Sequence, residues 1–423
     1  MKLLLKNGTV YQAGKLLKND LLVENGVITA LGTELKADSA QVIDVTDKLV
    51  APGLVDVHVH YREPGFTHKE TIKTGSLAAA HGGYTTVCAM PNLDPVPDTP
   101  AKVTAQVALN AADGVVKIKQ YGAITAGLKS DELLDYAGMK AAGAFAFSND
   151  GCGVQTAGTM YQAMLAAKKL DVALVAHVED NSLLFGGVMN AGKKAKELGL
   201  PGILGISESS QIARDLLLAK ETGVHYHVCH VSAKESVEIL RRAKQTAQNI
   251  SFEITPHHLL LCEDDITEDD GRFKMNPPLR AAEDRRALVE ALIDGTCDCI
   301  ATDHAPHSAE EKARGLEKSA MGTVGIESAF GVLYHGLVKT GRLPLERLLY
   351  LLTEGPAKVL GIDYGIRAGA PADLVMLDLT KEYRICSDEF LSKGRSTPFE
   401  GKEAAGKTVR TLVGGKVIYG EEF

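Results

Sequence analysis

Histidine and aspartate residues recur along the chain directly after short apolar runs. Six of them combine the residue types and the placement of metal ligands: His58, His60, Asp150, His177, His230 and Asp303. Imidazole and carboxylate groups are the ligands expected for zinc or a similar divalent ion. A single histidine of this kind is more simply explained as a hydrogen-bonded core residue, but six buried ionisable groups without partners would be costly. The pattern therefore predicts a metal centre.

The spacing of these residues predicts two cation sites that share a carboxylate. His58 and His60 are two residues apart, so on a strand their side chains face the same side and can bind one cation together. The other four complete the arrangement, with Asp303 in the first site, His177 and His230 in a second site, and Asp150 as a bridge. Two ions roughly 3.5–4 Å apart can hold a hydroxide between them and polarise a carbonyl group. The predicted chemistry is metal-assisted hydrolysis.

The middle of the chain alternates between predicted strands and predicted helices. The strands are apolar, β-branched runs: Leu54–Val59, Thr85–Ala89, Val115–Tyr121, Ala144–Phe147, Ala173–Ala176, His225–Cys229, Ser251–Ile254 and Cys299–Ala301. The helix-like segments between and after them are Lys69–Ala80, Lys102–Ala111, Asp131–Ala142, Thr156–Lys169, Ile212–Glu221, Ala233–Ala247, Ala282–Ile293 and Glu327–Lys339. Eight such alternations favour an α/β fold, a parallel (β/α)8 TIM barrel. Catalytic side chains of such barrels project from the C-terminal ends of the strands, where the six predicted ligands lie.

A doubly wound α/β sheet is the competing fold. It usually has fewer strands and a glycine-rich phosphate-binding turn after the first strand, and neither feature is evident in this sequence. One long insertion, Asp180–Gln211, interrupts the alternation, and we expect a surface loop or a short helix there.

Both ends of the chain are rich in short apolar runs separated by turns. Asn25-Gly26 is a typical hairpin signal near the N-terminus, and Gly414-Gly415 separates two predicted strands near the C-terminus. We therefore expect a small β-sandwich domain formed by residues 1–51 together with 365–423. The barrel is expected to comprise residues 52–364.

Composition and charge exclude several classes of protein. The 423 residues carry a formal net charge of -8, so binding to nucleic acid or to an anionic membrane is not expected. The N-terminal apolar run is too short for a signal peptide, and no run approaches the roughly 18 apolar residues of a membrane span. The seven cysteines are scattered without a C-x-x-C pair, which predicts reduced thiols rather than a disulfide framework. These features predict a cytoplasmic enzyme.

The motifs around these residues resemble the amidohydrolase superfamily and, within it, the bacterial type I dihydroorotases. The resemblance covers nearly the whole chain. Its opening motif runs from Pro52 to His60, and the arginine that follows, Arg62, is typical of dihydroorotases. The further matching motifs are Ala89–Asn92, Ser148–Gly151, Met275–Arg280 and Ala301–His307, of which the last two are the most specific.

The resemblance implies a reaction and a set of site residues. Type I dihydroorotases catalyse the reversible cyclisation of N-carbamoyl-L-aspartate to (S)-dihydroorotate and water, in de novo pyrimidine synthesis. The family pattern implies two zinc ions per chain, held by the six ligands above, and Asp303 as both ligand and acid/base. The residues implied to contact substrate are His60, Arg62, Asn92, Asn276, His307, Met321 and Gly322. Among them, Arg62, Asn92 and His307 would hold the substrate carboxylate, and Asn276 with the backbone around Met321 and Gly322 would contact the ring.

Two other functions compete with this interpretation. Hydantoinases and allantoinases share the fold and the cyclic-amide chemistry, but they usually bridge the metals with a carboxylated lysine on the fourth strand. Residues Gly143–Gly151 contain no lysine and offer Asp150 instead. Inactive dihydroorotase-like scaffolds of aspartate transcarbamoylase typically lose metal ligands, whereas all six are present here.

Further expectations concern assembly and motion. We expect a homodimer, and an active enzyme that also associates with aspartate transcarbamoylase remains open. The charged segment Glu310–Lys318 lies between His307 and Met321, so the loop over residues 308–320 is a candidate lid.

Overall fold

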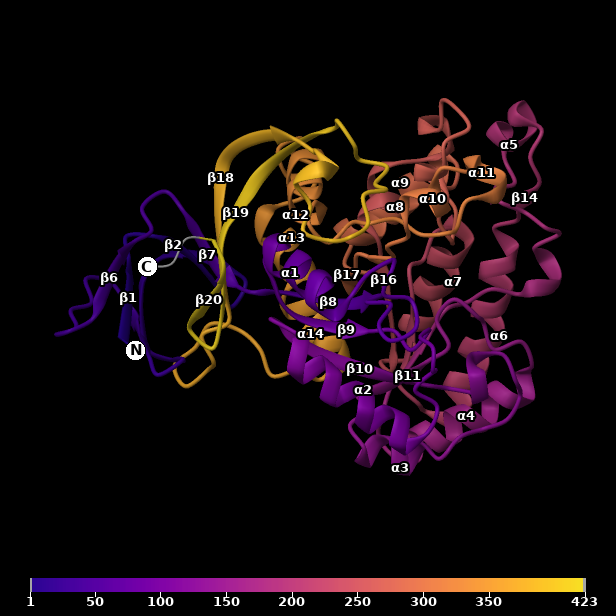
Figure 1. The fold of residues 1–423 in the computed structure, drawn as a ribbon, viewed down its shortest axis with the longest axis horizontal. Helices are drawn as coiled ribbons and strands as arrows, with labels where there is room; N and C mark the ends of the chain where they lie inside the picture. Colours follow the sequence, from indigo (N-terminus) through magenta and orange to yellow (C-terminus); the bar gives the residue numbers. More distant parts are fainter. Residues whose placement is uncertain (1, 421–423) are drawn as a thin grey trace.

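The computed structural model describes residues 2–420, and within them eight parallel strands form a barrel (Figure 1). These strands are β8 Leu54–Val59, β9 Tyr84–Ala89, β10 Lys117–Ala123, β11 Ala146–Ser148, β12 Leu174–Ala176, β15 Tyr226–Val228, β16 Ile250–Ile254 and β17 Cys299–Ile300. They are hydrogen-bonded in the order β17-β16-β15-β12-β11-β10-β9-β8. The chain after β17 closes the ring against β8, because Val59 pairs with His304 and the backbone N–H of His60 donates to His304 O at 2.9 Å. The predicted TIM barrel is confirmed.

Helices cover the outside of the barrel (Figure 1). The helices of the described chain are α1 Ile72–Gly82, α2 Pro100–Asp113, α3 Tyr136–Ala141, α4 Ala157–Lys169, α5 Lys193–Leu198, α6 Ile206–Thr222, α7 Lys234–Lys244, α8 Pro256–Leu260, α9 Ala282–Ile293, α10 Ala309–Lys312, α11 Gly315–Lys318, α12 Ala329–Leu333, α13 Leu345–Leu352 and α14 Glu354–Leu360. Among them, α5, α10 and α11 are short helices within the connections that follow β12 and β17. Threonine caps start several of them, since the hydroxyls of Thr71, Thr99 and Thr156 accept a backbone N–H from the first turn. No helix in residues 2–420 is long and apolar enough to cross a bilayer.

Two of the predicted segments agree with the structure only in part. The insertion Asp180–Gln211 contains the short helix α5 and a two-stranded parallel sheet of β13 Met189–Asn190 and β14 Gly202–Ile203. Its last residues are not an insertion at all, because α6 begins at Ile206 and buries Glu208 and Gln211. The predicted helix Glu327–Lys339 is divided into α12 and a π-helical turn, Tyr334–Val338.

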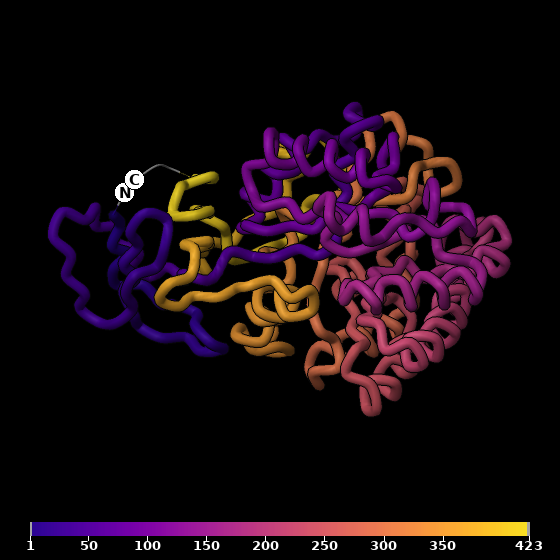
Figure 2. The backbone as a smooth tube through the Cα atoms, turned by 90° about the horizontal axis from the view of Figure 1, so that it is seen from below, coloured from indigo at the N-terminus to yellow at the C-terminus, as the bar shows by residue number. Residues whose placement is uncertain are grey.

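Strands from both ends of the chain lie side by side beyond the barrel (Figures 1 and 2). The N-terminal strands are β1 Lys2–Lys6, β2 Thr9–Gln12, β3 Lys15–Lys18, β4 Asp20–Glu24, β5 Val27–Gly32, β6 Gln41–Asp44 and β7 Leu49–Pro52, and the C-terminal strands are β18 Leu374–Arg384, β19 Glu403–Val413 and β20 Lys416–Tyr419. They form a four-stranded sheet, β5-β4-β1-β6, and a six-stranded sheet, β20-β19-β18-β7-β2-β3. The second sheet joins the two ends, since β7 pairs antiparallel with β18.

A separate apolar core holds these two sheets together. Leu3 and Leu21 from one sheet are buried with Val10, Leu374 and Leu412 from the other. Burial of apolar side chains between two sheet faces is what stabilises a β-sandwich, and here both termini supply it. The expected sandwich from both ends of the chain is therefore present, although Met1 and residues 421–423 lie outside the described residues. The exact domain boundaries stay a prediction.

Candidate metal centre

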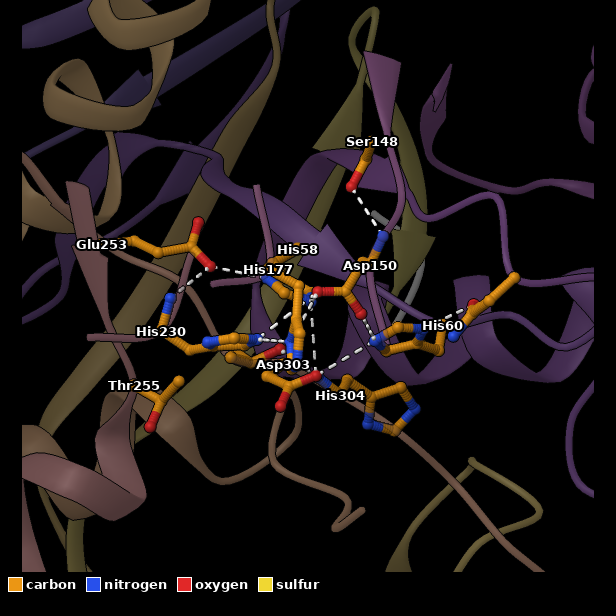
Figure 3. A network of polar contacts seen from close by, with 12 residues as sticks. His58, His60, Ser148, Asp150, His177, His230, Glu253, Thr255, Asp303 and His304 are labelled. Atoms are coloured by element: carbon orange, nitrogen blue, oxygen red, sulfur yellow. Dashed lines mark hydrogen bonds and ion pairs between the residues drawn. The ribbon is translucent and has the colours of Figure 1, made fainter. Parts of the chain in front are cut away.

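All six predicted metal ligands converge at the C-terminal mouth of the barrel (Figure 3). His58 is the penultimate residue of β8 and His60 directly follows that strand. The other four follow β11, β12, β15 and β17: Asp150, His177, His230 and Asp303. Every one of these residues is buried, with His58 fully excluded from solvent. Parallel barrel strands all end at the same rim, which is why residues up to 245 positions apart meet here.

Asp150 lies at the centre of the cluster. Its Oδ1 is 3.3 Å from His58 Nε2, 3.4 Å from His230 Nε2 and 3.6 Å from His177 Nδ1. Its Oδ2 is 3.3 Å from His60 Nε2. The carboxylate thus faces both predicted histidine pairs, which is the placement that a bridging ligand requires.

Asp303 faces the first histidine pair. Its Oδ1 lies 3.1 Å from His60 Nε2 and 3.4 Å from His58 Nε2. Both Asp303 and His230 have positive φ angles, +47° and +32°. Residues other than glycine adopt this backbone region rarely, and such residues concentrate at functional sites.

The donor atoms of the cluster fit divalent cations. His58 Nε2 and Asp150 Oδ1 are buried, face each other, and have no hydrogen-bond partner among the described residues. His177 Nδ1 and His230 Nε2 lie only 3.0 Å apart, as two nitrogens aimed at one position do. In each of two triplets, His58–His230–Asp303 and Asp150–His177–His230, the three donor atoms lie within 4.8 Å of one another. Nitrogen and carboxylate oxygen donors in this number are typical of zinc and related ions.

Carboxylates and imidazoles in the cluster shift each other's pKa values. Burial acts to raise the pKa of Asp150, but the facing His58 holds it well below its usual value. Burial likewise acts to lower the pKa of His177, yet Asp150 and Glu179 raise it to about 10. The buried carboxylates are therefore stabilised by positive charge beside them. Divalent cations held by these residues would supply that charge and would displace protons from the imidazoles.

Two carboxylates that the sequence did not single out contact the ligands. Glu253 on β16 accepts a hydrogen bond from His58 Nδ1 at 2.6 Å. Glu179 Oε2 lies 3.6 Å from His177 Nε2. A charged glutamate in the mostly apolar strand β16 is the sequence signal for Glu253. The signal for Glu179 is its position two residues after a predicted ligand.

Arg62, His307 and Met321 meet on one side of the mouth. Arg62 Nη2 lies 3.4 Å from His307 Nε2, which in turn is 2.8 Å from the backbone oxygen of Met321. Burial, with the positive charges of Arg62 and Lys69, lowers the pKa of His307 to about 3, so this imidazole is neutral. Gly322 follows with φ +143°, and a Cβ there would lie 2.6 Å from the backbone oxygen of Ala305. The structure thus brings together four residues predicted to contact substrate.

The two predicted asparagines lie against the metal ligands or their neighbours. Asn92 Oδ1 is 2.8 Å from His60 Nδ1, so this amide orients a predicted metal ligand. Asn276 Nδ2 donates to Glu179 Oε1 at 2.9 Å, while its Oδ1 is buried without a hydrogen-bond partner among the described residues. Because a carboxylate only accepts, the amide orientation of Asn276 is fixed, and its oxygen is left as an acceptor.

Three further buried histidines, His227, His257 and His258, lie near the cluster and have different surroundings. His258 Nε2 is 3.0 Å from the backbone oxygen of Pro277, and its Nδ1 is 2.8 Å from the Thr255 hydroxyl, as expected for a structural residue. His257 Nε2 is buried with no hydrogen-bond partner in the described chain. His227 Nε2 contacts Glu253 at 3.0 Å, one residue away from the metal cluster.

The candidate lid over residues 308–320 forms α10 and α11 and is tied down by a buried lysine. Lys312 Nζ donates to the backbone oxygens of Lys274, Ala320 and Gly322 at 2.9, 2.8 and 2.7 Å. All three ammonium protons are thereby used. These bonds join the segment to residues next to Asn276 and Met321, so it braces the substrate side of the mouth in this structure.

The seven cysteines are all free, and five of them are buried. This agrees with the reduced thiols expected from their spacing.

Comparisons with known proteins agree with the fold and with the family that the sequence motifs resemble. A family model described as Dihydro-orotase-like matches residues 47–236, and one described as Amidohydrolase family matches residues 196–419. A dihydroorotase of Ligilactobacillus salivarius is 63% identical over 427 residues, covering 100% of both chains. A dihydroorotase of Lactobacillus leichmannii is 57% identical and covers 99% of this chain and 98% of the relative.

Solved structures with the same fold include an L-hydantoinase (dihydropyrimidinase) from Arthrobacter aurescens. It superposes with a TM-score of 0.91 at 28% identity, covering 100% of this chain and 97% of that one. The D-hydantoinase from Thermus sp. gives 0.86 at 28% identity, covering 99% of this chain and 95% of that one.

A TIM barrel with histidines and aspartates gathered at its mouth, and relatives of this kind, define an amidohydrolase. Within that class, identities of 52–63% over essentially the full length show that the chain belongs to the dihydroorotase family.

Proposed function

We propose that this chain catalyses the reversible cyclisation of N-carbamoyl-L-aspartate to (S)-dihydroorotate and water, in de novo pyrimidine (UMP) biosynthesis. The observation that carries the proposal is the convergence of four imidazoles and two carboxylates on one rim, with Arg62 and His307 beside them. Full-length relatives named dihydroorotase support the same reaction.

We assign two divalent cations, zinc by preference, to the cluster. His58, His60 and Asp303 would hold one, His177 and His230 the other, and Asp150 would touch both. Bound cations supply Lewis acidity, which makes water nucleophilic at neutral pH and stabilises negative charge on a carbonyl oxygen.

Asp303 is the proposed proton carrier. Its Oδ1 faces the two imidazoles of the first pair, so we assign the transfer to Oδ2. In ring opening, Asp303 takes a proton from the attacking water and passes it to the leaving ring nitrogen. In cyclisation the same steps run in reverse. The low pKa of Asp303, held down by His58 and His60 against the effect of burial, keeps this carboxylate ionised before each cycle.

Arg62 and Asn276 are proposed to orient the substrate from opposite sides. The guanidinium of Arg62 stays charged although burial lowers its pKa to about 10, and a guanidinium matches a carboxylate with paired hydrogen bonds. His307 and the backbone at Met321 and Gly322 flank it. The unpartnered Oδ1 of Asn276 is suited to accept from an N–H of the ring.

A hydantoinase-type reaction on an uncharged cyclic amide is the second candidate, because hydantoinase structures share the fold closely. Arg62 favours a substrate with a carboxylate, and the presence of Asp150 in place of a lysine favours the dihydroorotase pattern. An inactive scaffold is disfavoured because all six ligands are present and converge.

Assembly, location and domain division are proposed on the same basis. We propose a cytoplasmic homodimer able to associate with aspartate transcarbamoylase. We also propose a barrel over residues 52–364, with residues 1–51 and 365–423 as the second domain.

The proposed reaction is tested by the ultraviolet absorbance change on opening of the dihydroorotate ring, with purified protein before and after treatment with a chelator. We expect turnover that is lost with the chelator and restored by added zinc. Turnover that persists in metal-free protein would exclude the proposed centre. Turnover of an uncharged hydantoin, with none of dihydroorotate, would favour the second candidate.

A further inference from the structure

Glu253 is a buried carboxylate that contacts the metal centre without belonging to the predicted ligand set. It lies on β16 and is fully excluded from solvent. Its Oε1 accepts from His58 Nδ1 at 2.6 Å and from the backbone N–H of His230 at 3.2 Å. One oxygen therefore touches a ligand of each proposed cation site (Figure 3).

The first contact decides which nitrogen of His58 faces the centre. An ionised carboxylate only accepts hydrogen bonds, so His58 Nδ1 carries the proton and Nε2 keeps its lone pair. It is Nε2 that lies 3.3 Å from Asp150 and 3.4 Å from Asp303. A wrong tautomer, or a rotated ring, would leave the first cation site without one of its nitrogens.

The second contact holds an unusual backbone conformation. His230, two residues after β15, has a φ of +32°, and from this position its Nε2 lies 3.0 Å from His177 Nδ1 and 3.4 Å from Asp150 Oδ1. Glu253 is the acceptor for the His230 backbone N–H. The same oxygen thus supports the backbone of a ligand in the second site.

Glu253 is itself fixed from below. Its Oε2 is 3.0 Å from His227 Nε2, while His227 Nδ1 is 2.9 Å from the Ser251 hydroxyl. That hydroxyl also lies 2.9 Å from His225 Nε2. Side chains two residues apart along an extended segment face the same side, as His225 and His227 do. Tyr226, which lies between them, faces the opposite side, where its hydroxyl donates to Asp215 on α6. The polar column therefore runs inside the barrel, beneath the metal centre.

We propose that Glu253 is a positioning residue for the metal centre: it sets the tautomer and ring orientation of His58 and the backbone of His230, and thereby the strength with which the chain holds its cations. The inference rests on the proposed metal centre. Carboxylates that hydrogen-bond to metal-binding histidines typically change metal affinity about 10- to 100-fold when removed.

The test is the rate at which zinc-loaded protein releases zinc to a chromophoric chelator in excess. Glu253→Ala is expected to release zinc about 10- to 100-fold faster than the unmodified protein, and Glu253→Gln to fall between the two. Glutamine keeps an oxygen for His58 but cannot also accept from His227 with its amide nitrogen. If Glu253→Ala does not fold, Glu253→Gln carries the test.

A matched control separates loss of a buried charge from loss of this contact. Asp215 on α6 is also fully buried, and it accepts a hydrogen bond from the Tyr226 hydroxyl at 2.7 Å. Tyr226 is the residue before His227, but its side chain lies on the outer face of β15. Asp215→Asn is expected to lower the melting temperature and to leave zinc release unchanged. Zinc release from this variant as fast as from Glu253→Gln would overturn the proposal.

A second measurement reports the geometry of the centre directly. The visible absorption of cobalt-loaded protein depends on the arrangement of its ligands, so it should change in Glu253→Gln and less in His227→Gln. Unchanged zinc release together with an unchanged cobalt spectrum in Glu253→Gln would contradict the proposal. Unmodified protein that binds neither metal would instead contradict the metal centre itself.

Discussion

The mouth of the barrel has two halves that are built differently. The half that we propose to bind metal, called the metal-binding half, consists of the six predicted ligands, which come from the ends of five strands and meet around Asp150. The half that we propose to bind the substrate carboxylate, called the carboxylate-binding half, consists of Arg62, His307 and the backbone of Met321, and it is held by hydrogen bonds between loops.

The two halves differ in whether their buried polar atoms have hydrogen-bond partners within the protein. In the metal-binding half, buried atoms such as His58 Nε2 and Asp150 Oδ1 have no hydrogen-bond partner in the described residues, so this half calls for cations. In the carboxylate-binding half, Arg62 Nε already donates to the Pro306 oxygen at 3.3 Å, and Lys312 ties the adjoining loop down. In the proposed function, the strand ends would position the chemistry and the loops would select the substrate. Variants in the two halves should therefore fail in different ways.

Asp303→Asn should have the largest effect. It removes the proton carrier while leaving an oxygen toward His60, so kcat should fall by about 10²- to 10⁴-fold with the fold intact. Steady-state kinetics of ring opening measure the loss, and circular dichroism checks the fold. Near-normal kcat in a folded variant would remove Asp303 from the acid/base role.

Arg62→Ala should affect substrate binding rather than chemistry. Loss of a charged hydrogen-bonding partner should raise KM for N-carbamoyl-L-aspartate on the order of 10- to 100-fold. Binding of an uncharged cyclic ureide should change little, and Arg62→Lys should not restore the loss, because an ammonium lacks the planar fork. Equal losses for charged and uncharged ligands would argue for a hydantoinase-like site.

Asn92→Ala tests which half of the mouth Asn92 supports. The resemblance assigns Asn92 to the substrate carboxylate, but its Oδ1 contacts His60 Nδ1 at 2.8 Å. We therefore expect faster zinc release to a chelator, by about tenfold, in addition to any rise in KM. An effect on KM alone would place Asn92 wholly in the carboxylate-binding half.

Lys312→Met should have the smallest catalytic effect. It removes three hydrogen bonds to backbone oxygens, so thermal unfolding should show a loss of about 1–3 kcal/mol. KM should rise less than in Arg62→Ala, and zinc content should stay unchanged. Lys318→Met, at an exposed position in the same segment, is the control and should match the unmodified protein. A loss of zinc on Lys312→Met would show that the two halves are not separable.

The residues of the metal-binding half could be placed together from the sequence for a physical reason. Strand ends are marked by local patterns, and β8 spans the predicted Leu54–Val59. Once the barrel was inferred, its geometry brought the strand ends together. Glu253 escaped notice because its partner His58 lies 195 positions away and no local pattern announces that contact.

The sequence patterns of loops and of edge strands predict their structure less well than those of the barrel strands. The charged residues around Lys312 suggested a mobile lid, whereas burial of that one ammonium among three backbone oxygens depends on the tertiary structure. In the small sandwich, β3 was missed because Lys15–Lys18 is short and mostly exposed. The start of α6 was read as insertion because polar residues such as Glu208 are buried there through contacts with Ser232.

The most direct test of the account is the metal content of the purified chain. Elemental analysis should find close to two divalent ions per chain, with activity falling in step as a chelator removes them. A fully active protein that carries no divalent metal would contradict it.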